Sequence, residues 1–292
     1  MTPHEILACI ELGIYCILVI PVTLCTWHYL WKRQTGWLYL HAFTFAKILG
    51  PAIYLSISNQ SNPSRDAQMA AQILYQIALG PLLSAALSFV NTSRSTSTST
   101  SSRPEEEPLQ LSSSAETARY SPLVQTTKGA PLHGLLRLLH PVVITGLVLG
   151  IISGIDRAPD SSGSLDDRKY VSGVSLAKAS AALFFLVLVG ITLGIVSLWK
   201  SRRQLSTVSC YITSCMAAIM PCLFLRVLYS ILGASNQPSF LEYRRGNAGK
   251  FDVLRGSWVA YFFLGLVPQA LVLGAYAGCG VLAWVRERRG KA

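Results

Sequence analysis

Long apolar stretches separated by short polar segments form the main pattern of this chain. A window of about 19 residues finds seven candidate helices, at residues 6–30, 37–58, 68–90, 135–155, 173–199, 207–233 and 257–285. Each is long enough to cross a hydrocarbon core of about 30 Å at about 1.5 Å per residue. No segment alternates apolar and polar residues as a lipid-facing barrel strand does. The pattern therefore predicts an all-α polytopic integral membrane protein with seven transmembrane helices.

Basic residues are unevenly distributed between the two sides of these spans. They are more frequent in the loops after spans 1, 3 and 5 and in the C-terminal tail, for example Lys32, Arg202 and Arg289. The positive-inside rule then predicts a lumenal or extracellular N-terminus and a cytosolic C-terminus. The first span has no basic segment before it, so we expect it to stay in the membrane as a helix and not to be cleaved. We expect the protein in the endoplasmic reticulum or another endomembrane.

The polar segments divide the chain into three parts. Residues 1–90 hold spans 1–3 and residues 133–292 hold spans 4–7, and together they form one membrane domain. Residues 91–132 are dominated by Ser and Thr at their start, which predicts a disordered cytosolic linker. The Asp-rich segment 156–171 is interpreted as a surface loop. Asn59 lies in a sequon on the predicted lumenal side, where glycosylation is possible in principle.

Composition agrees with a lipid environment and narrows the function. The chain is 51% hydrophobic and only 13% charged, whereas a soluble domain has about 25% charged residues. Its net charge of +11 is spread over short clusters between spans, a distribution that does not predict nucleic-acid binding. All seven cysteines lie in the apolar spans without CxxC spacing, so we interpret them as small buried apolar residues and not as a disulfide framework or a metal site.

Familiar enzyme motifs are absent from the sequence. It has no GxSxG, HExxH, Walker A, dinucleotide-binding glycine pattern or DFG set, and we predict neither a metal ion nor a cofactor. The absence of these motifs is compatible with acid-initiated chemistry, because that chemistry needs only one carboxylic acid placed in an apolar cavity.

Three ionisable residues interrupt the apolar spans: Glu11, Lys47 and Arg226. A charge near the middle of a bilayer costs a few kcal/mol even on mild insertion scales, so such residues usually face a partner or an aqueous cavity. Lys47 is about ten residues from either end of its span, deeper than a lysine stem comfortably reaches. Glu11 lies nearer an end, where it either points into headgroups or pairs with Lys47 or Arg226.

Several spans resemble a known family. The segments are GWLYLHAFTFAKILGPAIYLSIS, AAQILYQIALGPLLSAALSFV, LRLLHPVVITGLVLGIISG, IMPCLFLRVLYSILG and LVPQALVLGAYAGCG. They resemble a fungal group of small seven-helix membrane proteins that includes a terpene cyclase of the ascofuranone pathway. The resemblance covers nearly all the helices but not the Ser/Thr-rich linker. The family often has Arg at position 47 and Glu at position 269, where this chain has Lys47 and Gln269.

The resemblance implies a membrane-bound cyclase that acts on a prenylated, epoxidised meroterpenoid precursor. A carboxylic acid would protonate the substrate, and an apolar, aromatic wall would shield the carbocation. The acid candidates are Glu11, Glu242 and Asp252. The substrate-binding candidates are the two intramembrane cations Lys47 and Arg226, the aromatic residues Tyr54, Tyr229 and Phe224, and Gln269.

Other function classes fit the same spans. A seven-helix lipid or toxin exporter, or a stress-response membrane protein, would use the intramembrane cations to hold an anionic headgroup. A receptor fits less well, because only about five residues precede the first span and no loop cysteines are present to form a disulfide. In each case the expected partners are a lipophilic small molecule and the lipid bilayer.

Overall fold

The computed structural model describes residues 2–30, 34–58, 60, 65–100, 130–157, 166–200, 207–244, 249–252 and 256–289. All regular elements in these ranges are helical. They are α1 (Pro3–Leu30), α2 (Gly36–Ser58), α3 (Arg65–Ile77), α4 (Leu79–Thr100), α5 (Ala130–Asp156), α6 (Asp167–Lys200), α7 (Thr207–Ser235), α8 (Phe240–Arg244), α9 (Trp258–Tyr261), the π-helix η2 (Phe262–Leu266) and α10 (Val267–Arg289).

The prediction of seven apolar spans is confirmed for the described part of the chain. Seven helical segments there are long and apolar enough to cross a membrane, with ends within six residues of those expected. Two of these spans are composite. Met69–Ser93 combines α3 and α4 across a turn at Ala78, and Trp258–Arg286 combines α9, η2 and α10.

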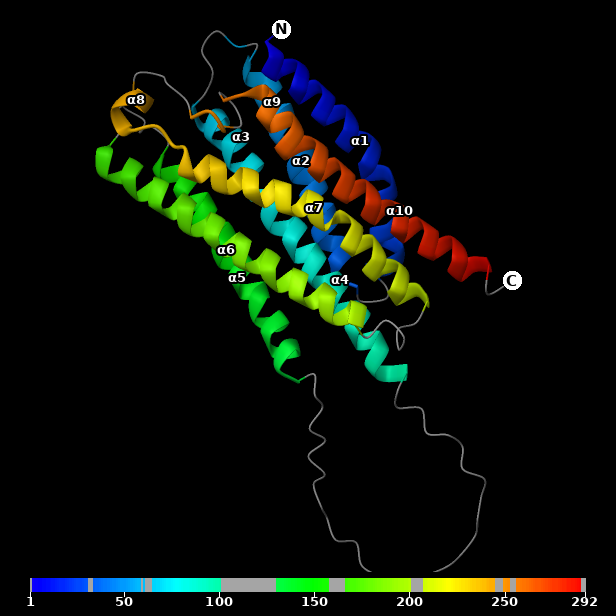
Figure 1. The fold of residues 1–292 in the computed structure, drawn as a ribbon. Coiled ribbons are helices and arrows are strands. Elements are labelled where there is room, and N and C mark those ends of the chain that lie inside the picture. Colours follow the sequence, from blue (N-terminus) through cyan, green and yellow to red (C-terminus); the bar gives the residue numbers. More distant parts are fainter. Residues whose placement is uncertain are drawn as a thin grey trace, which may run out of the picture.

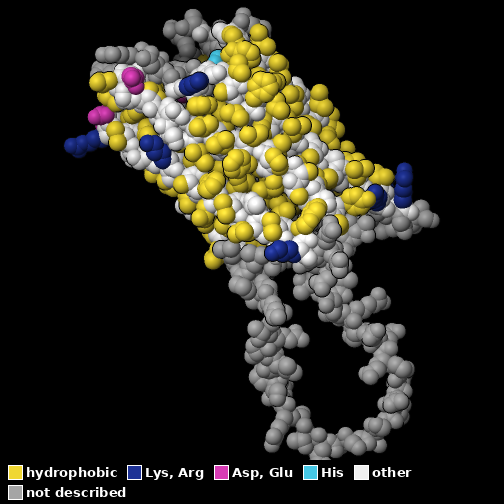
Figure 2. All heavy atoms as spheres, in the orientation of Figure 1, with side chains coloured by type: hydrophobic (Ala, Val, Ile, Leu, Met, Phe, Trp, Pro, Cys, Tyr) yellow, Lys and Arg dark blue, Asp and Glu magenta, His cyan; other side chains and the backbone are white. Residues whose placement is uncertain are grey.

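The helices run side by side in an elongated bundle (Figure 1). The N-terminus, α3, α8 and α9 lie at one end, called here the N-terminal end, and the C-terminus lies toward the other. Apolar side chains cover the middle of the face in Figure 2, and the charged ones lie toward its two ends. Ile17 and Trp27 are among the large exposed apolar side chains, at 70% and 72% exposure. An apolar middle of this kind suits contact with lipid.

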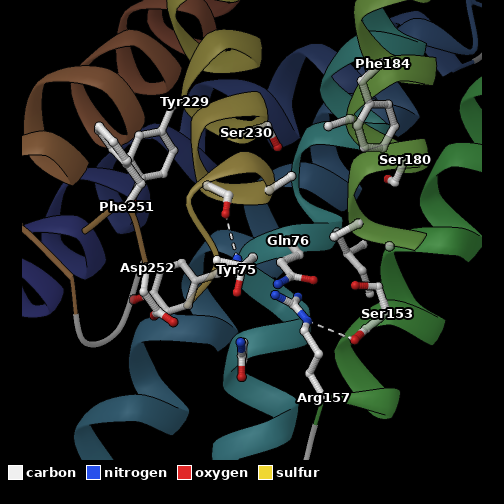
Figure 3. Close-up of a pocket in the computed structure, with 18 of the residues that line it drawn as sticks. Tyr75, Gln76, Ser153, Arg157, Ser180, Phe184, Tyr229, Ser230, Phe251 and Asp252 are labelled. Carbon is white, nitrogen blue, oxygen red and sulfur yellow. Dashed lines mark hydrogen bonds between the residues drawn. The ribbon is translucent and has the colours of Figure 1, made fainter. Parts of the chain in front are cut away.

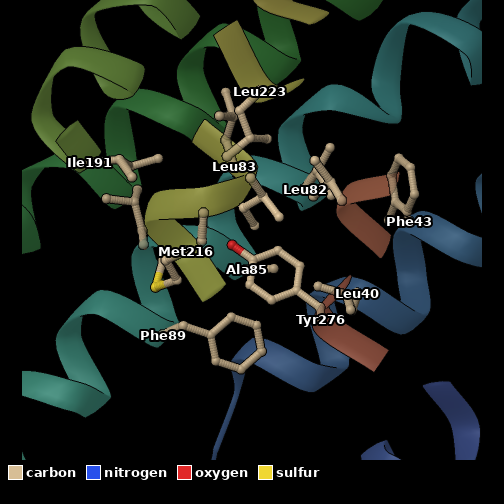
Figure 4. Packing of buried hydrophobic residues seen from close by; sticks show 14 of the residues in the cluster. Leu40, Phe43, Leu82, Leu83, Ala85, Phe89, Ile191, Met216, Leu223 and Tyr276 are labelled. Atoms are coloured by element: carbon tan, nitrogen blue, oxygen red, sulfur yellow. The ribbon is translucent and has the colours of Figure 1, made fainter. Parts of the chain in front are cut away.

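The third span is the centre of the bundle. Its α4 portion contacts α2, α5, α6 and α7, and it supplies many of the fully buried residues. Leu82 and Leu83 of α4 pack near Phe43 of α2, Leu223 of α7 and Ile191 of α6 (Figure 4). The other spans surround this core and bring polar side chains from several helices together at the N-terminal end.

Two boundary predictions need correction. The linker does not begin at residue 91, because α4 continues as a helix to Thr100. Thr92 donates its hydroxyl hydrogen bond to the Ser88 carbonyl at 2.9 Å, one turn earlier, so a hydroxyl-rich sequence is accommodated in a helix here. Helix α5 begins at Ala130, three residues before the predicted start of the second half. Residues 101–129 and Asn59, with its predicted glycosylation, lie outside the described residues.

Two smaller predictions hold only in part. The predicted surface loop 156–171 is too long at both ends, because Asp156 belongs to α5 and residues 167–171 belong to α6. The cysteines lie in the apolar helices as expected, but Cys9 and Cys16 are exposed and not buried. Asp166 and Asp167 are exposed at the start of α6, and the Asp166 carboxylate accepts a hydrogen bond from the Arg168 backbone N–H at 3.0 Å. All seven cysteines are free and lie in helices.

Candidate functional site

Glu11 and Lys47 form a buried ion pair between α1 and α2. The Lys47 ammonium donates to Glu11 Oε1 at 2.8 Å, and the two side chains are 1% and 0% exposed. The Tyr261 hydroxyl of α9 lies 3.0 Å and 2.8 Å from the two carboxylate oxygens and 3.2 Å from the Lys47 nitrogen. We call these three residues the Glu11 cluster. The pairing explains how two charges are accommodated at membrane depth.

Aromatic rings enclose the ammonium of Lys47. Its nitrogen lies 5.1 Å from the ring centroid of Tyr75 and 5.9 Å from that of Tyr15, distances at which a cation is attracted by a ring face. A small cavity of about 10 Å³ lies beside the cluster and is also lined by Tyr54 and His4. This is about the space that one water molecule needs.

Local structure explains the position of Tyr261. Ser257 caps α9, with its hydroxyl oxygen accepting from the Ala260 N–H at 3.4 Å, and this starts the last span just before Tyr261. The π-helix η2 follows directly at Phe262–Leu266. Single π turns inside α-helices are rare overall, but many of those that occur lie at functional sites. A π turn changes which side of the helix the flanking residues face.

A larger cavity lies next to the Glu11 cluster, between α3, α5, α6, α7 and the segment 249–252. Its volume is about 100 Å³, room for several water molecules or for one end of a larger ligand. We call it the Arg226 cavity. Its lining includes Arg226. Figure 3 shows four other lining residues, Tyr229, Arg157, Asp252 and Tyr75. It therefore combines two cations, a carboxylate and aromatic rings.

One wall of the Arg226 cavity is a hydrogen-bonded network around Arg157. Its Nε donates to the Ser153 carbonyl at 3.0 Å. Its Nη2 lies 2.7 Å from the side-chain oxygen of Gln76 when that amide is assigned the orientation that satisfies both its oxygen and its nitrogen. In that orientation the Gln76 nitrogen also donates to the Gly150 carbonyl at 3.3 Å, so α3 and α5 are joined. Burial lowers the pKa of the Arg157 guanidinium, while the charge of Asp252 raises it. Arg157 is thus held firmly in place.

Arg226 is held differently. It is 4% exposed, and its Nε has no hydrogen-bond partner among the described residues. Its guanidinium carbon lies 5.6 Å from the Tyr229 ring centroid. The hydroxyls of Tyr229 and Tyr15 and both side-chain polar atoms of Gln269 are likewise buried without partners in the described ranges. Buried polar atoms usually have a partner. The open donors of Arg226 and Tyr229, which both line the cavity, therefore mark a place where water or a ligand binds.

Tyr75 connects the two sites. It lines both the small cavity beside the Glu11 cluster and the Arg226 cavity, and its ring meets that of Tyr261 edge to face at 5.9 Å. Tyr229 lies 6.0 Å from the same ring and 6.2 Å from that of Phe251. The aromatic side chains therefore form a continuous wall between the ion pair and the cavity.

Most of the residues expected from the sequence meet at one of these two sites. Glu11 pairs with Lys47 and not with Arg226, and it does not point into headgroups. Tyr54 lines the small cavity, whereas Asp252 and Tyr229 join Arg226 at the larger one. Gln269 is fully buried in α10, but it is not among the residues that line either cavity.

Two of the expected site residues do not take part. Phe224 is 48% exposed on the outside of α7, because it is two residues from Arg226 and a helix turns by about 200° over that spacing. Glu242 is exposed, and its carboxylate accepts from the Ser239 N–H at 2.9 Å and hydroxyl at 3.0 Å. It stabilises the start of α8 and lines neither cavity.

Two site residues were missed from the sequence. Arg157 was assigned to a polar loop, although it follows directly on the last apolar turn of its span and is 6% exposed. Tyr261 was one aromatic residue among several at the start of the last span. One feature of the sequence could have identified Tyr261. It places a hydroxyl one turn inside the last span, and a buried carboxylate on another helix needs a hydrogen-bond donor of this kind.

Comparison with known families gives two overlapping matches, at residues 1–113 and 106–286, to the model of a domain of unknown function, DUF7702. No curated protein and no solved structure matches the chain.

Proposed function

The chain belongs to the DUF7702 family, and we propose that it is a membrane-bound terpene cyclase acting on a prenylated, epoxidised substrate held in the Arg226 cavity. The observation that supports this proposal is a carboxyl group, Asp252, on the lining of a cavity with aromatic walls inside a membrane bundle. Acid-initiated cyclisation needs such a group and such walls, and it needs no metal ion or cofactor.

The three acid candidates differ in their surroundings, and these differences support one assignment. Both carboxylate oxygens of Glu11 already accept hydrogen bonds within the Glu11 cluster, and Glu11 does not line the Arg226 cavity. Glu242 is exposed and caps a short helix. Asp252 is half-buried and lines the cavity, so the proposal assigns the acid to Asp252.

The proposed reaction is an isomerisation. Asp252, which acts on Arg157 in its charged form, first takes up a proton from water. It then donates this proton to the epoxide oxygen, the C–O bond breaks, and an alkene of the same chain supplies the electron pair for the new ring bond. The resulting carbocation loses a proton to the Asp252 carboxylate, which restores the acid. The rings of Tyr75 and Phe251 provide faces that stabilise a cation.

The test is turnover by membranes that contain the protein. An epoxyfarnesyl phenol is supplied, and a cyclised product of unchanged mass is followed by chromatography and mass spectrometry. Asp252→Asn is expected to lower turnover by at least about 100-fold, in the range of a lost general acid. Glu242→Gln is the matched control and should keep wild-type turnover. Equal activity in the Asp252→Asn and wild-type membranes would remove Asp252 from the mechanism.

An exporter of a lipophilic anion is the second candidate, because two buried arginines line the same cavity. Transport would move the supplied compound across sealed vesicles without changing its structure, whereas the cyclase would change it in open membranes. The proposal also places the N-terminus in the lumen of an endomembrane and the C-terminus in the cytosol. Protease protection of terminal tags in microsomes tests that orientation.

A further inference from the structure

The buried charges of the described residues do not cancel. Glu11 and Lys47 neutralise each other at 2.8 Å, and the charge of Asp252 acts on Arg157 at the edge of the bundle. Arg226 remains, and no carboxylate among the described residues lies within ion-pair distance of it. An unneutralised guanidinium at this depth is costly unless water or a counter-ion compensates it.

Position shows how deep this charge lies. Arg226 is nine residues before the end of α7 at Ser235, which places it about 14 Å below the N-terminal end of the bundle. Half of a hydrocarbon core of about 30 Å is about 15 Å. Arg226 therefore lies well inside a core of that thickness, with the Arg226 cavity beside it.

The open donor of Arg226 and the cavity beside it occur together. Its Nε lacks a partner among the described residues, the neighbouring hydroxyl of Tyr229 also lacks one, and both residues line the Arg226 cavity. A guanidinium presents several N–H groups in a fixed plane that matches a carboxylate or phosphate, and a tyrosine hydroxyl adds a third donor. Donors without acceptors, next to a positive charge without a partner, are what an oxyanion requires.

We infer that the Arg226 cavity binds a lipophilic molecule through a single oxyanion, a carboxylate or phosphate group, held by Arg226 and Tyr229. The cavity volume of about 100 Å³ suits the charged end of such a molecule, and its lining also includes apolar residues such as Leu147 and Phe184 for the adjoining carbons. The inference deepens the proposed function, on whose cavity it rests. A bound oxyanion would also neutralise Arg226 during the proposed cyclisation. Without it, the positive charge of Arg226 would repel the carbocation.

Binding is tested apart from turnover, with the purified protein in lipid nanodiscs. Three probes are compared: laurate, its neutral analogue dodecanamide, and dodecyl phosphate. We expect the wild-type protein to bind laurate or dodecyl phosphate at least tenfold more tightly than dodecanamide, after subtraction of binding to empty nanodiscs. Arg226→Gln should remove this difference and leave dodecanamide binding unchanged. Arg226→Lys, which keeps the charge but loses the planar fork, should retain part of it.

Arg168→Gln is the matched control, because Arg168 is an exposed arginine at the same end of the bundle. It should bind all three probes as the wild type does. Equal wild-type affinity for laurate, dodecyl phosphate and dodecanamide would overturn the inference, as would unchanged discrimination in Arg226→Gln. Displacement of bound laurate by millimolar inorganic phosphate would also overturn it, in favour of a free-phosphate site. Anion-selective binding without cyclisation would refute only the proposed cyclase, and cyclisation without anion selectivity would refute only this inference.

Discussion

Replacing Glu11 by Gln should destabilise the bundle strongly, because it leaves the charge of Lys47 buried without its partner. Lys47 is 1% exposed and its ammonium donates to the Glu11 carboxylate at 2.8 Å. The ammonium also donates to the Tyr261 hydroxyl at 3.2 Å, a group that carries no charge. The substitution keeps the size of the side chain, so the change in stability reports mainly on the lost charge.

The magnitude follows from the burial of both partners. Two unit charges about 4 Å apart attract by about 4 kcal/mol at an effective dielectric constant of about 20. Removal of one partner from a buried pair typically costs about 3–5 kcal/mol, since the remaining charge stays desolvated. At about 2–4 °C per kcal/mol, Glu11→Gln should lower the unfolding midpoint by on the order of 10 °C. Glu11→Gln with Lys47→Met removes both charges and should recover most of that loss.

The assay is thermal unfolding in nanodiscs, followed by tryptophan fluorescence at one fixed scan rate, because irreversible unfolding makes the midpoint depend on that rate. The wild type, both single variants and the double variant form a double-mutant cycle. Arg168→Gln is the exposed control and should unfold with the wild type. A double variant whose loss equals the sum of the two single losses would refute the reasoning, because independent sites add and paired charges do not.

Three further substitutions test packing and hydrogen bonding by the same assay. Gln269→Met should raise the midpoint, because the buried amide has no partner in the described ranges and its desolvation costs about 1–3 kcal/mol. A lower midpoint would contradict this and show that the amide binds water or a ligand. Gly280→Ala should lower the midpoint, because the added methyl meets the Trp37 ring, whereas Gly13→Ala meets nothing within 4 Å and should not. Ser180→Ala should cost about 1 kcal/mol by removing a 2.6 Å hydrogen bond to a carbonyl of α5, and an unchanged midpoint would contradict this.

The seven spans could be predicted from the sequence because lipid imposes a simple rule on it. Every backbone polar group in hydrocarbon must be paired, so a long apolar run has few alternatives to a helix. The rule is weaker at the edges of the membrane. There α4 continues ten residues past the predicted end of its span at residue 90, because Ser and Thr are compatible with a helix where they bond to an earlier carbonyl.

The candidate site could be predicted only in part. The cost of burying a charge identified Glu11, Lys47 and Arg226 without any structure. That cost does not say which charges meet, because pairing depends on the rotation of each helix about its axis. Packing against neighbouring helices sets that rotation, and an apolar pattern on all sides of a span leaves it undetermined. Because the rotation of α7 is undetermined in this way, the sequence predicts Phe224 in the cavity, whereas in the structure it lies on the outer face of α7.

The depths of the buried polar residues connect stability and function. Glu11, Lys47 and Gln269 lie eight, eleven and eleven residues from the ends of their spans at the N-terminal end, so all three are about 12–17 Å deep, as Arg226 is. In this layer the Glu11–Lys47 pair is complete, whereas Arg226 lacks a counter-charge among the described residues. The pair therefore stabilises the contact of α1, α2 and α9 without a ligand. Arg226 remains available to bind a ligand. Glu11→Gln should therefore act mainly on stability, and Arg226→Gln should act mainly on ligand binding.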